Sequence, residues 1–150
     1  MKEQRRSVLK KVTASVAALF GLTYSARASE AVEKRVYNVN THQEVPLFSG
    51  AVKHGGFVFI AGKGAHFEGD IKAHTEHVLK ELEKELKNAG SSMEKVLKVN
   101  VYLNDIKDYQ AMNEVYRGKF GNKPPVRTTV GVGGGVPGNS LVEIDCIAAV

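Results

Sequence analysis

Apolar and polar residues alternate along several short stretches of the chain, and each such stretch predicts a β-strand. The clearest is residues 95–103, where one side of the predicted strand is wholly apolar: Leu97, Val99, Val101 and Leu103. Residues 57–61 are apolar on both sides, which is typical of a strand in the middle of a sheet. Three further strands are predicted at residues 34–39, 126–132 and 141–150.

Two other stretches repeat apolar residues every three or four positions and therefore predict helices. The first covers residues 72–88, and Gly90 stands at its expected C-terminal stop. Asp108 is placed to cap the second helix, which Gly121 and the pair Pro124-Pro125 end. The inner stripe of this second helix is predicted to be Tyr109, Met112, Val115, Tyr116 and Phe120.

These elements predict an α+β fold in which two helices pack on one face of a mixed sheet. Each helix has a single apolar stripe to bury, so both are expected on the same face. The central strands also carry apolar residues that two helices cannot reach. We therefore expect the other face of the sheet to be covered by further copies of the chain.

The N-terminal segment has the pattern of an export signal. Arg5-Arg6-Ser7-Val8-Leu9-Lys10 fits a twin-arginine signal, residues 12–22 are uncharged and largely apolar, and Ala26-Arg27-Ala28 fits a cleavage site. The apolar run is too short to span a bilayer, which needs about 20 residues. We expect residues 1–28 to be a cleavable signal, residues 29–150 to be one domain, and the mature protein to be periplasmic without a membrane anchor.

The positive charge of the chain is concentrated in that segment. Of 21 Lys and Arg and 16 Asp and Glu, residues 1–28 hold six and one, so residues 29–150 hold 15 of each and are formally neutral. Nucleic-acid binding needs a basic surface on the folded domain. We therefore expect no nucleic-acid partner.

The single cysteine, Cys146, has no partner in the chain for a disulfide. It alternates with Ile144 and Ala148 on one side of the last predicted strand. This placement favours a buried structural thiol over a nucleophile.

The last quarter of the chain contains a candidate site. Arg127 and Glu143 each lie in an otherwise apolar or small-residue segment, and a connection with five glycines, too glycine-rich to be helical, joins them. We expect this connection to bring them onto neighbouring strands. Arg127 is suited to bind a carboxylate through two parallel hydrogen bonds, and Glu143 is suited to accept a proton from water. A plain salt bridge between adjacent strands is the alternative.

Several segments resemble the RidA family of enamine and imine deaminases over residues 44–150. They are Ala89-Gly90-Ser91-Ser92, residues 95–103, residues 113–120, Pro124-Pro125-Val126-Arg127-Thr128-Thr129 and residues 141–148. The resemblance implies a homotrimer of chorismate-mutase-like subunits that needs no cofactor. It also implies sites at subunit interfaces, with Arg127 near the loops of a neighbouring subunit.

The resemblance also implies further substrate-binding residues. Phe48 stands where the family commonly has a tyrosine that closes the site, Gly62 matches a glycine that lets the ligand approach, and the backbone near Thr129 helps to orient it. In other places the chain departs from the family pattern. Lys63 is expected to add a cation near the mouth of the site, and Glu81 replaces an asparagine of the first helix. The segment 127–137 is one residue longer than expected.

The implied reaction is hydrolysis of a 2-imino acid or a 2-aminoacrylate to a 2-oxo acid and ammonia. Arg127 would hold the substrate carboxylate and Glu143 would activate water. A trimeric carboxylate-binding or chaperone-like protein without catalysis is the alternative. An endoribonuclease comes third, because the domain is neutral.

Two other patterns are rejected. His74, His77 and Glu81 have a helical spacing that suits a metal, but His74 is in register with Val78 and Leu82, where a hydrogen-bonded core or interface histidine is commoner. We expect no metal site. The glycines of residues 131–138 resemble nucleotide-binding loops, but those motifs need a helix next, and a strand is predicted here.

Overall fold

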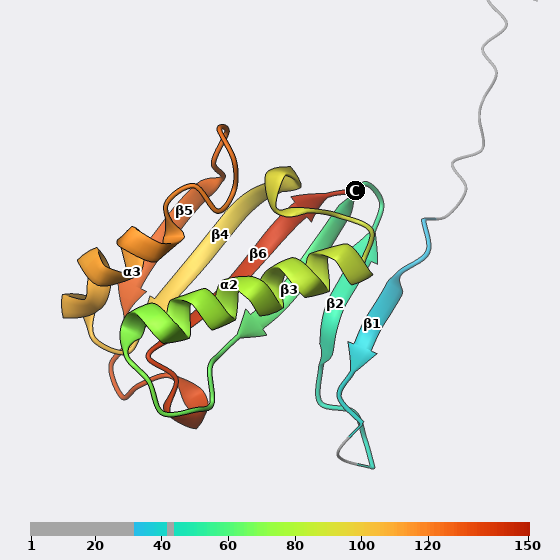
Figure 1. The fold of residues 1–150 in the computed structure, drawn as a ribbon. Coiled ribbons are helices and arrows are strands. Elements are labelled where there is room, and N and C mark those ends of the chain that lie inside the picture. Colours follow the sequence, from blue (N-terminus) through green and yellow to red (C-terminus); the bar gives the residue numbers. More distant parts are fainter. Residues whose placement is uncertain (1–31, 42–43) are drawn as a thin grey trace, which may run out of the picture. The chain divides into compact units, whose positions relative to one another are not determined.

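A computed structural model describes residues 32–41 and 44–150. Its centre is one six-stranded sheet with the order β1-β2-β3-β6-β4-β5 (Figure 1). The strands are β1 (Arg35–Val39), β2 (Ser49–His54), β3 (Phe57–Lys63), β4 (Val96–Leu103), β5 (Val126–Gly131) and β6 (Val142–Ala149). β4 and β5 are parallel and the other neighbours are antiparallel, so the sheet is mixed, as predicted.

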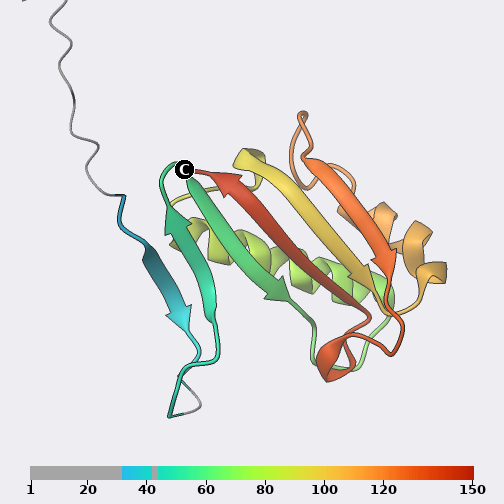
Figure 2. The ribbon, with the colours of Figure 1, turned by 180° about the vertical axis from the view of Figure 1, so that it is seen from behind.

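Two α-helices, α2 (Ile71–Asn88) and α3 (Tyr109–Tyr116), lie on the same face of this sheet. Seen from behind, the sheet lies in front of both helices (Figure 2). Short 3-10 turns complete the chain: η1 (Met93–Lys95), η2 (Ile106–Asp108) and η3 (Pro137–Asn139). The predicted α+β fold, with two helices on one face, is confirmed.

The core lies between the helices and the inner face of the sheet. α2 contributes Val78, Leu82 and Leu86, which are fully buried and lie on one side of the helix. The strands contribute alternate residues, among them Val99 and Val101. This arrangement defines the two faces of the sheet: the helix face, which is buried, and the open face, which the helices do not cover.

Three details of the predicted elements are wrong. β2 was not expected from the pattern, because its sequence mixes small, polar and apolar residues, and pairing with β1 and β3 makes it a strand. α3 ends at Tyr116, although Phe120 still enters the core. Asp108 makes no capping hydrogen bond with its side chain, because it belongs to η2, where Asp105 is the capping residue.

The apolar side of β4 also differs from the prediction at its first residue. Val96 is buried and Leu97 is exposed, because the pairing of β4 with β6 shifts by one residue between Val96 and Lys98. Such a shift moves side chains to the other face of a strand. Val99, Val101 and Leu103 point into the core as expected.

The open face carries exposed apolar side chains from an inner strand, β3, and from the edge strand β5. Phe57 and Phe59 of β3 are exposed and alternate with the buried Val58 and Ile60, and Val126 and Val130 of β5 are exposed as well. Apolar surface of this kind is typical of a face that contacts another protein chain. The expectation that other copies cover it stays a prediction.

The predicted signal, residues 1–28, lies outside the described residues. Within residues 32–41 and 44–150, no helix is long and apolar enough to cross a membrane.

Candidate functional site

Arg127 lies on β5 and points toward α3. Its Nη1 donates to Asn113 Oδ1 at 2.8 Å and its Nη2 donates to the Tyr109 hydroxyl at 3.2 Å. Its Cζ lies 4.6 Å from the ring centroid of Tyr116, within cation–π distance. A guanidinium has five N–H donors, so three remain for a ligand. The side chain is half-buried, and it is therefore fixed in place and still accessible.

Glu143 lies near the start of β6 on the open face. It borders a hollow of about 260 Å³ lined by Tyr102, Gly135, Val136 and Asp145, together with Val132 and Pro137. Among the residues that the structure describes, no side chain forms a hydrogen bond or an ion pair with the Glu143 carboxylate. This carboxylate therefore lies at the border of the hollow with its hydrogen bonds not taken by another described side chain.

Gly62 makes room for Glu143. A Cβ on Gly62 would lie 2.0 Å from Glu143 Oε1 and 2.7 Å from Glu143 Cδ. No real Cβ approaches another atom so closely, so any other residue at position 62 would displace the Glu143 side chain. Gly62 was expected to let the ligand approach, and in the structure its neighbour is Glu143, the candidate general base.

Within one chain, Arg127 and Glu143 do not form a common site. β4 lies between β5 and β6, so the expectation of neighbouring strands is wrong. The two residues also lie on opposite faces. Arg127 is in register with Val99, whose side chain is in the core, whereas Glu143 is in register with Tyr102 on the open face. The same separation excludes the alternative of a salt bridge between these two residues within the chain.

Phe48 and Thr129, two further predicted substrate-binding residues, are also separated from each other within one chain. Phe48 is 54% exposed and directly precedes β2, at the sheet end where β3 finishes with Gly62 and Lys63 and β6 begins. Thr129 is in register with Val101 on the helix face, as Arg127 is with Val99. Its hydroxyl is buried without a hydrogen-bond partner in the described part of the chain. Phe48, Gly62 and Glu143 therefore lie at one end of the sheet, away from Arg127.

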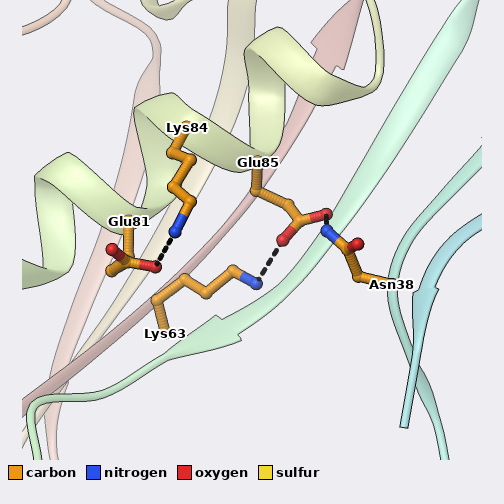
Figure 3. A network of polar contacts seen from close by, with 5 residues as sticks. All are labelled: Asn38, Lys63, Glu81, Lys84 and Glu85. Carbon is orange, nitrogen blue, oxygen red and sulfur yellow. Dashed lines mark hydrogen bonds and ion pairs between the residues drawn. The ribbon is translucent and has the colours of Figure 1, made fainter.

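Lys63 does not lie at the mouth of a site, so that prediction is wrong. Its Nζ contacts Glu85 Oε2 of α2 at 2.9 Å, and Asn38 Nδ2 donates to Glu85 Oε1 at 2.7 Å (Figure 3). The Lys63 and Glu85 side chains are only 18% and 9% exposed. Glu81 lies on the outer side of α2, where it pairs with Lys84 at 3.6 Å. The buried network joins α2 to two strands.

His74 is a hydrogen-bonded core histidine, as predicted. A backbone amide can only donate and a carbonyl can only accept, so its Nδ1 accepts from Leu141 N at 3.1 Å and its Nε2 donates to Phe67 O at 2.9 Å. The residue is buried. In the described residues no group of three or more metal-binding side chains comes together.

A polar cluster on the open face was not predicted from the sequence. Asp145 accepts from Asn100 Nδ2 at 2.9 Å and from the Tyr102 hydroxyl at 3.1 Å. Burial and the neighbouring Asp145 carboxylate raise the pKa of Tyr102, so this phenol stays protonated and donates. The sequence does contain a signal for this cluster, because Lys98, Asn100 and Tyr102 alternate with the core-facing valines and must therefore share the other face of β4.

Cys146 is buried, as predicted for a structural thiol. Burial is the main cause that raises the pKa of this thiol to about 12, with a smaller contribution from Asp145. A thiol with so high a pKa is a poor nucleophile near neutral pH.

The sequence and the fold were then compared with known proteins. The family model described as Endoribonuclease L-PSP matches residues 41–150. This chain belongs to that family, the RidA superfamily. A RutC family protein of Pyrococcus horikoshii is 39% identical over 120 residues, covering 75% of this chain and 94% of the relative. Protein mmf2, mitochondrial, of Schizosaccharomyces pombe is 42% identical, covering 68% and 86%.

Solved structures of RidA-superfamily proteins have the same fold. A YjgF family protein of Neisseria meningitidis matches with a TM-score of 0.71 at 27% identity, covering 79% of this chain and 96% of that chain. A YjgF/YER057c/UK114 family member of Mycobacterium tuberculosis matches with a TM-score of 0.69 at 30% identity, covering 79% and 100%.

One relative has a name that states an activity. Reactive Intermediate Deaminase A, chloroplastic, of Arabidopsis thaliana is 32% identical over 108 residues. The match covers 67% of this chain and 57% of that protein. The family therefore includes a reactive intermediate deaminase, and the family model itself has the name of an endoribonuclease.

Proposed function

We propose that this protein is a hydrolytic deaminase of 2-imino acids, with a site that two copies of the chain form together. The observation behind this proposal is the separation of Arg127 and Glu143. Each has hydrogen-bonding capacity available to a ligand, yet they lie on different faces and non-adjacent strands of one chain. Arg127 of one protomer and Glu143 of another can meet the same substrate only across a subunit boundary.

In this site Arg127 binds the substrate carboxylate. Its three remaining N–H groups are enough for two parallel bonds, and hydrogen bonds to charged groups contribute about 1.5–3 kcal/mol. Because Asn113 and Tyr109 already hold the guanidinium, little side-chain entropy is lost when the substrate binds.

Glu143 then acts as the general base. It takes a proton from a water molecule whose oxygen attacks the C=N carbon, and it passes that proton to the imine nitrogen, which becomes the amine of a carbinolamine. Glu143 then moves the hydroxyl proton of the carbinolamine to the amine, the C–N bond breaks, and ammonia and the 2-oxo acid are released. The water thus supplies the new carbonyl oxygen, and the reaction involves no change of oxidation state. General-base assistance typically contributes about 10²- to 10⁴-fold in rate.

A homotrimer is the assembly that we propose. The exposed Phe57, Phe59, Val126 and Val130 of the open face support burial against other copies of the chain. The polar cluster at Asp145 is internally hydrogen-bonded, which lowers the cost of burying it in such an interface.

The direct test is to mix the purified protein with a freshly generated 2-imino acid and to follow release of the 2-oxo acid. The wild-type protein should accelerate release over buffer, and Arg127→Ala should remove most of the acceleration. Arg35→Ala, which changes an exposed arginine on β1, is the matched control and should behave as wild type. No acceleration by the wild-type protein with several imines would end the deaminase proposal.

Glu143→Gln separates catalysis from binding. A deaminase should lose turnover in this variant and still bind the 2-oxo acid product. A carboxylate-binding protein without catalysis would be indifferent to the change. Endoribonuclease activity is the second candidate because the family model has that name, and RNA cleavage by the same preparations would support it. The equal number of acidic and basic residues in 29–150 makes it less favourable.

The proposed location is the periplasm, after export through the twin-arginine signal and its removal before Ser29. There the imine would come from an oxidase or dehydrogenase of amino acids in the same compartment.

A further inference from the structure

The hydroxyl of Tyr109 lies beside the guanidinium of Arg127. It accepts a hydrogen bond from Arg127 Nη2 at 3.2 Å, and the Arg127 Cζ lies 5.7 Å from the centroid of its ring. Tyr109 is the first residue of α3, and Asn113, one turn further on, binds the other terminal nitrogen of the same guanidinium. The first two turns of α3 thus hold both terminal nitrogens of the Arg127 guanidinium.

The Tyr109 hydroxyl has a second capacity that this contact does not use. A phenol has one O–H donor in addition to its acceptor positions. The guanidinium has no acceptor, so Arg127 can occupy only the acceptor side of the oxygen. In the described part of the chain, no acceptor takes the Tyr109 proton, and the side chain is partly buried, as that of Arg127 is. A free O–H donor therefore stands next to the free N–H donors of Arg127.

The other tyrosine at this guanidinium is different. The ring of Tyr116 lies against the Arg127 Cζ, but the residue is only 9% exposed and its hydroxyl is buried. Burial is the main cause that raises the pKa of Tyr116 to about 12. Its ring can support Arg127, but its hydroxyl cannot reach a ligand that enters from outside. Of the two, only Tyr109 has a hydroxyl open to the ligand side of the guanidinium.

We infer that Tyr109 is a further substrate-binding residue, whose O–H donates to the same carboxylate that Arg127 binds. This inference rests on the proposed function. The substrate carboxylate is then bound by two groups together, the guanidinium of Arg127 on β5 and the phenol of Tyr109 on α3. It selects a ligand with a carboxylate, because a neutral carbonyl offers fewer acceptor positions to these donors.

Tyr109→Phe tests the role, because it keeps the ring and its contact with Arg127 and removes only the hydroxyl. The affinity for a 2-oxo acid, pyruvate, is measured by calorimetry, and KM and kcat are measured with the corresponding imine. We expect Kd and KM to rise roughly tenfold, as for the loss of one hydrogen bond to a charged group, with kcat within about twofold of wild type. Tyr37→Phe removes a hydroxyl from β1, at the opposite edge of the sheet, and should change neither constant.

The outcomes distinguish this inference from the proposed function. If Arg127→Ala abolishes pyruvate binding and Tyr109→Phe binds as tightly as wild type, the inference is overturned and the proposed function stands. If Tyr109→Phe lowers kcat and leaves Kd unchanged, the residue acts on the reaction in another way and the inference is again overturned. If the wild-type protein neither binds pyruvate nor hydrolyses an imine, both proposals fall.

Discussion

Replacement of His74 by leucine is predicted to destabilise the domain strongly. The imidazole joins two loops that are far apart in sequence, because one ring nitrogen donates to Phe67 O and the other accepts from Leu141 N. Leucine has a similar volume and can form neither bond. It would leave the Phe67 carbonyl and the Leu141 amide, both part-buried, without this partner, in a position where the wild-type side chain is only 2% exposed.

The size of the loss follows from these contacts. A buried polar group that is left unpaired costs about 1–3 kcal/mol, and because these two groups are part-buried, the lower half of that range applies to each. The edge-to-face contact of His74 with Phe67, with centroids 4.9 Å apart, adds about 0.5–1.5 kcal/mol. Since leucine recovers part of the packing, we expect a total loss of about 2–5 kcal/mol in the free energy of unfolding.

The assay is urea denaturation followed by far-ultraviolet circular dichroism at one fixed protein concentration, because the stability of an oligomer depends on concentration. His74→Gln supplies one donor and one acceptor again, and it should recover at least half of the loss. A leucine variant within about 0.5 kcal/mol of wild type would refute the hydrogen-bond reasoning. A glutamine variant as unstable as the leucine variant would assign the effect to ring packing instead.

Four further results are expected. Burial raises the pKa of the Cys146 thiol from the ordinary 9.0 to about 12, so the unfolded chain loses this proton at a lower pH than the folded domain does. The free energy of unfolding should therefore fall as the pH rises from 9.0 to about 12. Cys146→Val removes the thiol and should make this fall smaller in urea titrations. Lys63→Met leaves the buried Glu85 without its cation and should cost about 3–5 kcal/mol in the same assay. Lys84→Met breaks only a surface pair and should cost less than about 1 kcal/mol. Lysines in place of Arg5-Arg6 should leave the precursor in the cytoplasm, as cell fractionation can show, and equal export of that variant would contradict the predicted signal.

The regular elements could be predicted because their patterns are long and periodic. The first helix was expected at residues 72–88 and occupies Ile71–Asn88, and of the four alternating apolar residues expected on the core side of β4, all but Leu97 lie in the core. Each helix has one apolar stripe to bury and the predicted strands supply an apolar sheet face, so the layer arrangement could be predicted as well.

The relative position of Arg127 and Glu143 could not be predicted from their closeness in the chain. Strand order depends on which edges pair, and the chain inserts β6 between β3 and β4. One signal in the sequence was available: β4, α3 and β5 form a strand–helix–strand unit, which usually places the two strands side by side and parallel. That rule puts β5 beside β4 and leaves β6 to pair with the other edge of β4.

The face on which the Lys63 side chain lies also could not be predicted from the alternation of residues along β3. Ile60 is in register with Cys146, but Lys63 is in register with Ile144, so β3 contains an irregularity between these residues. Strict alternation from Ile60 would place Lys63 on the open face, and the irregularity turns it toward Glu85 of α2 instead. Local register shifts of this kind depend on cross-strand pairing, which a single sequence does not specify.

The central claim is that one substrate meets Arg127 of one protomer and Glu143 of another. The measurement that tests it most directly uses two inactive variants, Arg127→Ala and Glu143→Gln, co-expressed with different affinity tags and purified through both tags. In a mixed ring, a site is intact when its arginine comes from the Glu143→Gln chain and its glutamate from the Arg127→Ala chain. Each mixed trimer that carries both tags then has one intact site among three, so the purified sample should have about one third of wild-type deaminase activity. Activity no higher than that of the two variants assayed separately would contradict a shared site.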